Sequence, residues 1–181
     1  MKHARVLITL RCNRHCAGCC NTYERVMSNV IPIRSVAELD IDFDTVSITG
    51  GEPMLFPELT LASIAQTRLS CPGAKVYLYT ALHTTRMPEI VERVDGVHYT
   101  LHAEATRQDA LGFQHFQDLI AGAHLRDKSF QLYVDPRCQQ PIQVCPWLWS
   151  QVEIKPWMTE DEVIESRSRG RLAEETIYIV G

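Results

Sequence analysis

The sequence predicts an α/β protein folded as a partial (β/α)6 barrel with a parallel sheet. Short runs rich in β-branched and apolar residues alternate with helix-like stretches, which is the pattern of βαβ units. Each unit needs about 30 residues, so six of them fill most of a chain of 181 residues. A complete eightfold barrel needs roughly 250 residues. Because the chain has no internal repeat, low-complexity tract or linker, residues 1–181 are expected to form one domain with a short tail at about 156–181.

Six strands and five helices are expected to alternate along the chain. The strand runs are short, apolar and β-branched, and they cover residues 4–10, 45–49, 75–80, 96–102, 129–134 and 151–155. The helices are expected at residues 35–39, 57–70, 87–94, 108–124 and 160–169. In the helix at 57–70, the face expected to be buried consists of Leu59, Leu61, Ile64, Ala65 and Leu69. A last apolar run lies at 176–180.

The composition indicates an ordinary globular protein. Hydrophobic residues make up 45% and charged residues 22% of the chain, and the net charge of −4 argues against broad, non-specific nucleic-acid binding. No signal peptide and no apolar run of membrane-spanning length is recognised, so a cytoplasmic protein without membrane contact is expected. Seven cysteines in such a chain indicate metal or redox chemistry more than disulfides.

Three cysteines of the N-terminal part have the spacing C-x3-C-x2-C. Cys12, Cys16 and Cys19 lie within eight residues, directly after the first predicted strand. Such a loop can wrap one face of an iron–sulfur cluster and leave one metal corner without a protein ligand. A structural zinc site is the alternative, but it is four-coordinate and usually draws ligand pairs from separated places. His15 and Cys20 are the nearby candidates for a fourth ligand.

A second motif, Gly50-Gly51-Glu52-Pro53, follows the predicted strand at 45–49. The two glycines allow a sharp turn and close approach to a ligand, and the glutamate adds an acceptor for an ammonium group. By itself this segment also reads as an ordinary strand-to-helix turn with Gly and Pro at its bends.

The two motifs together, each after a strand, resemble those of the radical S-adenosylmethionine (radical SAM) enzymes over residues 4–155. The resemblance implies a [4Fe–4S] cluster held by Cys12, Cys16 and Cys19, whose open iron binds the amino and carboxylate groups of SAM. The reduced cluster would cleave SAM to methionine and a 5′-deoxyadenosyl radical, which abstracts hydrogen from a substrate. A reducing partner such as flavodoxin or ferredoxin is implied as well.

Ligands of parallel βα folds bind at the carboxyl ends of the strands. By this rule and the resemblance, the cofactor-binding residues are expected to be Gly50, Gly51, Glu52, Pro53, Thr80, His102, Ile154 and Lys155. The Gly50–Pro53 turn is expected to bind the methionine end of SAM, and the last predicted strand end and the cysteine loop to frame the adenine. The catalytic residues and the substrate are not readable from the sequence.

The chain departs from the common family pattern at Gly18, where the residue before the third cysteine is often aromatic. The Cys16–Asn21 segment is instead similar to the loop of anaerobic ribonucleotide reductase activases, which place a glycyl radical on a partner protein. A third radical SAM group, the small enzymes of 7-deazapurine synthesis, matches poorly, because Asn21 stands where that group commonly has Asp. A non-catalytic Cys-rich metal-binding module remains an alternative of another class. Structural roles are expected for Cys71, Cys138 and Cys145 as thiols and for Trp147, Trp149 and Trp157 as core residues.

The substrate side of the barrel is expected to be open, because only the residues after Lys155 remain to cover it. A homodimer, a protein partner or a macromolecular substrate would then close the opening. The exception would be a tail that folds back so that residues 176–180 add a strand to the sheet.

Overall fold

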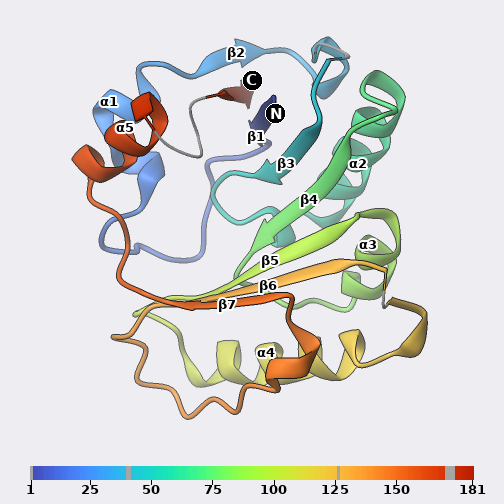
Figure 1. The fold of residues 1–181 in the computed structure, drawn as a ribbon, viewed down its shortest axis with the longest axis vertical. Helices are drawn as coiled ribbons and strands as arrows, with labels where there is room; N and C mark the ends of the chain where they lie inside the picture. Colours follow the sequence, from blue (N-terminus) through green and yellow to red (C-terminus); the bar gives the residue numbers. More distant parts are fainter. Residues whose placement is uncertain (1, 40–41, 126, 170–173) are drawn as a thin grey trace.

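The computed structural model describes all residues except 1, 40–41, 126 and 170–173. Its centre is one open, all-parallel sheet of eight strands in the order β2-β8-β1-β3-β4-β5-β6-β7, as Figure 1 shows. The strands are β1 (His3–Leu7), β2 (Ile31–Ile33), β3 (Thr45–Thr49), β4 (Lys75–Thr80), β5 (Gly96–Leu101), β6 (Ser129–Val134), β7 (Gln151–Ile154) and β8 (Glu175–Val180). The predicted α/β class and the parallel sheet are confirmed.

Among the described residues there are five α-helices, four of them predicted and one, at residues 24–27, not predicted. They are α1 (Glu24–Met27), α2 (Pro57–Ser70), α3 (Met87–Arg93), α4 (Arg107–Ile120) and α5 (Glu160–Arg169). The helix expected to reach residue 124 ends at Ile120 and is followed by a 3-10 turn, Ala123–Leu125. The helix expected at 35–39 is a 3-10 turn, Val36–Glu38, whose first backbone groups are capped by the Ser35 hydroxyl.

The two faces of the sheet differ in polarity. The face under α2, α3 and α4 carries buried apolar side chains such as Val6, Ile48, Leu78 and Leu132, which form the main core. Along each strand the intervening residues point to the opposite face, because side chains alternate in a β-strand. There β1, β3, β4, β5 and β6 present the polar residues Arg5, Ser47, Tyr79, His98 and Gln131.

The prediction of which α2 residues are buried is wrong in part. Leu61 and Ile64 are buried, but Leu59, Ala65 and Leu69 are exposed. Their places against the sheet are taken by Thr60, Ser63 and Thr67. These small residues can be buried because the two threonine hydroxyls donate to backbone oxygens, Thr60 to Pro53 O at 2.8 Å and Thr67 to Ser63 O at 2.8 Å.

The tail adds the strand β8 to the sheet. The prediction of six strands was therefore too low. β8 pairs with β1 on one side and with the short β2 on the other, which is the exception named above for residues 176–180. To reach it, residues 155–159 leave β7 and run to α5, which packs on α1 at the opposite end of the sheet (Figure 1). Leu7, Val26 and Ile177 form a small second core beneath these helices. Within the described residues, no helix combines the length and apolar character needed to cross a membrane.

Candidate metal and cofactor site

The three motif cysteines lie on one irregular loop, residues 8–23, that follows β1. The backbone turns back at Cys16–Cys19, where the Cys19 N–H donates to Cys16 O at 3.2 Å. Burial raises the pKa of the Cys16 thiol to about 12, and the neighbouring Glu104, Cys19 and Cys12 add to this shift. Burial also raises the pKa of Cys19, with Cys20 and Cys12 contributing. The thiols are therefore close enough for their charged forms to disfavour one another.

The Gly50–Pro53 turn is joined directly to this loop by backbone hydrogen bonds. The Gly51 N–H donates to Thr9 O at 2.7 Å, and the Glu52 N–H donates to Arg11 O at 2.9 Å. A Cβ at Gly50 would lie 2.2 Å from Thr9 O, and one at Gly51 would lie 2.1 Å from Arg11 O. Gly50 also has a φ of +137°, which side chains disfavour. The two glycines thus allow the second motif to hold the residues just before Cys12.

The Glu52 carboxylate is buried within the protein. Its Oε1 accepts from the Thr80 hydroxyl at 2.6 Å and from Met54 N at 2.9 Å, and its Oε2 accepts from Ala81 N at 2.9 Å. Burial raises the pKa of Glu52, although these hydrogen bonds and Arg14 oppose the shift. In this structure Glu52 and Thr80 thus bind each other and tie the ends of β3 and β4 together.

Arg14, inside the cysteine loop, is a site residue that the sequence analysis missed. Its side chain is only 6% exposed, and its Nη2 pairs with Asp109 near the start of α4 and donates to Ala81 O at 3.0 Å. Its Nη1 lies 3.7 Å from Glu52 Oε2. The Asp109 side chain in turn accepts from Thr106 in a capping box. The sequence gave no sign that Arg14 pairs with Asp109, because the two residues are 95 positions apart.

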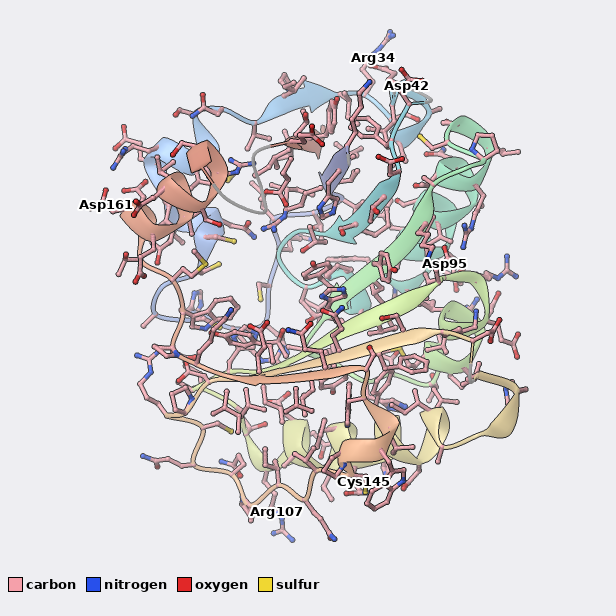
Figure 2. The ribbon with its side chains drawn as sticks, in the orientation of Figure 1. Arg34, Asp42, Asp95, Arg107, Cys145 and Asp161 are labelled. Atoms are coloured by element: carbon pink, nitrogen blue, oxygen red, sulfur yellow. The ribbon has the colours of Figure 1, made fainter. Side chains whose placement is uncertain are left out.

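We expect Arg14→Met to lower the free energy of unfolding by about 3–5 kcal/mol, because it leaves Asp109 buried and unpaired. Urea denaturation of the cluster-free protein measures this change. The matched control is Arg34→Met, since the Arg34 side chain is 92% exposed, projects from the surface in Figure 2 and has its one ion pair among the described residues with Glu38. That control should change stability by at most about 1 kcal/mol. Equal losses in both variants would contradict a structural role for the Arg14 pair.

His102 follows β5 and faces the cysteine loop, as expected for a site residue. One ligand atom each from Cys16, His102 and Glu104 lies within 4.8 Å of the others, a group able to hold a metal ion. Burial lowers the pKa of His102 to about 4, and Arg14 adds to the shift, so its ring is neutral near pH 7. Glu104 accepts from Ala17 N at 3.0 Å, which fixes the carboxylate beside the loop. Sequence reasoning had not selected Glu104.

The end of β7 is placed differently from the expected adenine frame. Ile154 is in register with Val134, so its side chain lies on the helix-covered side of the sheet, and it is 69% exposed there. Lys155 pairs with Glu153, and its Nζ lies 5.7 Å from the centre of the Tyr133 ring. The structure therefore brings Gly50, Gly51, Glu52, Pro53, Thr80 and His102 to the cysteine loop, while Ile154 points away from it.

The remaining cysteines and tryptophans fill other places. Cys71 is buried at the end of α2, and Cys145 lies beside α4, where its N–H donates to Gln117 Oε1 at 2.8 Å (Figure 2). Trp149 packs in the core as predicted, but Trp147 is 81% exposed. Trp157 packs on the Tyr133 ring of β6 and also lies against Gly18 of the cysteine loop, a contact that its sequence context did not indicate.

Comparisons with known proteins give a structural likeness alone. No protein-family model matches the sequence, and no curated protein matches it. Among solved structures, the chain is similar to that of BtrN in complex with AdoMet and 2-DOIA, with 24% identity and a TM-score of 0.49. The similarity covers 72% of this chain and 56% of the BtrN chain.

Proposed function

We propose that this protein is a radical SAM enzyme that binds one [4Fe–4S] cluster and reductively cleaves S-adenosylmethionine. The observation that carries the proposal is the joining of the two motifs at the carboxyl end of a parallel sheet. The Gly50–Pro53 turn donates two backbone hydrogen bonds, from Gly51 N and Glu52 N, to the segment that leads into Cys12, and this supports one shared site for both motifs.

The residues present fit such a cluster. Cys12, Cys16 and Cys19 offer three thiolates, the ligand type that iron–sulfur clusters take from proteins. Cys20 is adjacent, but its thiol donates to Asn21 Oδ1 at 3.7 Å. When bound and reduced, the cluster would supply the electron that cleaves SAM.

This chain's own side chains would hold the cluster loop in place. Arg14 fixes the middle of the loop to α4 and to Ala81, the residue after β4, and the glycine turn fixes the start of the loop. With Glu52 engaged by Thr80, Ala81 and Met54, the turn would offer SAM its backbone more than its carboxylate. The neutral His102 ring borders the loop on the other side.

The test is anaerobic reconstitution with iron and sulfide, followed by dithionite and SAM. We expect about four irons per chain and release of 5′-deoxyadenosine and methionine in equal amounts. Protein that holds iron but releases no 5′-deoxyadenosine would count against the proposal. The same preparation can test three finer predictions. These are an activase reaction, a flavodoxin or ferredoxin reductant, and a dimer or macromolecular substrate.

A non-catalytic metal site is the second candidate, and one observation favours it. The clustering of Cys16, His102 and Glu104 offers a sulfur, a nitrogen and an oxygen ligand, all of which zinc accepts. This site would use one motif cysteine instead of three. The two candidates therefore predict different sets of residues required for metal binding.

A further inference from the structure

The polar face of the sheet, opposite α2, α3 and α4, carries a charged side chain that the proposed function does not use. Arg5 of β1 lies on this face, and its side chain is 22% exposed. Its Nε and Nη2 lie 3.1 Å and 2.9 Å from Glu175 Oε1 on the neighbouring strand β8. Among the described residues, its Nη1 has no hydrogen-bond partner. Because a guanidinium has five N–H donors in one plane, Arg5 keeps donors for a ligand on this face.

The charges around Arg5 leave one positive charge in excess. The Glu175 side chain is only 1% exposed, and its carboxylate is shared by Arg5 and by Arg167, whose Nη2 lies 3.1 Å from Glu175 Oε2. Glu153, which also lies on this face, pairs with Lys155. Two guanidinium groups thus meet one carboxylate, in a chain whose overall charge is −4. Since charges removed from water are stable only when they are paired, an anion from outside would complement this group.

The side chains beside Arg5 on this face are aromatic or neutral. The Arg5 Cζ lies 5.9 Å from the centre of the Tyr79 ring, which stacks on the His98 ring at 4.2 Å and 18°. Burial lowers the pKa of His98 to about 4, and His3 and Arg5 add to this shift, so the His98 ring is neutral near pH 7. Gln131 is the neighbour of His98 on β6. Both side chains are partly exposed and have no hydrogen-bond partner within the described part of the chain, so they offer free polar edges next to the charged donor.

These side chains lie near the strand ends that carry the proposed cofactor site. Arg5 is two residues before the end of β1, about 7 Å along the strand, and the cysteine loop follows that end. Tyr79 directly precedes Thr80, whose hydroxyl donates to the Glu52 carboxylate of the second motif. A molecule that lies against Arg5, Tyr79 and His98 would therefore reach the cofactor site from the polar face.

We propose that this place binds the substrate through an oxyanion, a carboxylate or a phosphate, and that Arg5 contacts that group. The inference rests on the proposed function, because it takes the molecule beside the cofactor site to be the substrate. With Nε and one N–H of Nη2 directed to Glu175, the Nη1 end of the guanidinium can form two parallel hydrogen bonds to an oxyanion. The edges of His98 and Gln131 suit hydroxyl or amide groups on the rest of a small polar molecule. The excess positive charge disfavours a cationic substrate.

Calorimetric titration of the anaerobically reconstituted protein with inorganic phosphate, acetate and methylammonium, at constant ionic strength, tests the proposal. We expect an anion to bind and methylammonium not to bind, and the tighter of the two anions identifies the group that the substrate carries. Hydrogen bonds to charged groups change affinity by roughly 10- to 150-fold, which is the loss expected in Arg5→Gln. Arg5→Lys, which keeps the charge without the planar fork, should lie between the two. Arg34→Gln is the matched control and should bind like the wild type, because the Arg34 side chain is 92% exposed.

Unchanged anion affinity in Arg5→Gln would overturn the proposal, and so would a wild type that binds neither anion. Arg5→Gln is expected to fold, because Glu175 keeps its pair with Arg167. Should it not fold, Arg167→Gln removes the same excess charge, and wild-type anion affinity in that variant would overturn the proposal equally. Anion binding that depends on Arg5, in a protein that releases no 5′-deoxyadenosine after reduction, would refute the proposed function and leave the anion site standing. Release of 5′-deoxyadenosine without anion binding would refute this inference alone.

Discussion

Replacing Cys12, Cys16 or Cys19 with alanine is expected to reduce bound iron from about four per chain to near zero, with loss of the brown absorbance and of 5′-deoxyadenosine release. The reason is that a cluster with three protein ligands cannot keep its position when one of them is removed. Iron analysis, the visible spectrum and product chromatography of the reconstituted variants measure this effect.

The controls use the other cysteines and the rival metal ligands. Cys20→Ala tests a thiol that directly follows Cys19, and Cys145→Ala tests one beside α4; both should keep the wild-type iron content. Glu104→Gln should keep its iron as well, because the carboxylate accepts from Ala17 N and is not needed as a ligand. Loss of metal in Glu104→Gln together with its retention in Cys12→Ala would instead establish the site of Cys16, His102 and Glu104.

Gly51→Ala is expected to have the second large effect, on the cluster and on stability together. Its Cβ would lie 2.1 Å from Arg11 O and 2.5 Å from Arg11 C, so the backbone that leads into Cys12 must move. Overpacking costs about 1–3 kcal/mol, occasionally more. We expect a loss of this size in urea denaturation and a reconstituted iron content well below that of the wild type. The expected loss of iron would show that the turn supports the cluster loop.

Gly73→Ala is the matched control for this substitution. Gly73 lies in the turn between α2 and β4, and a Cβ there would meet no atom within 4 Å. Its stability should change little, and its iron content should equal that of the wild type. A Gly51→Ala protein with full iron content and unchanged stability would show that the loop adapts without the close backbone approach.

The sequence was sufficient for most of the elements because local signals specify them. Apolar β-branched runs between Gly, Pro and polar residues predicted β3, β4 and β6 with their observed bounds. The bounds of α2 were also predicted correctly. The three-residue β2 was missed because Pro32 and its short length give no strand signal. The pairing of β8 with β1 could not be predicted, because any apolar run can fill either edge of a sheet and the choice depends on long-range packing.

What the sequence determined by itself is the parallel α/β class and the two motifs at the carboxyl ends of β1 and β3, because periodicity and residue spacing are local properties. The tertiary structure decided which side chains meet these motifs. It placed Arg14 on Asp109, Glu52 on Thr80, and Trp157 over Gly18. Each of these contacts joins segments that are distant in the chain. The physical reason is that buried charges are stable only when they are paired and buried rings are stabilised by packing, whichever segments the fold brings together.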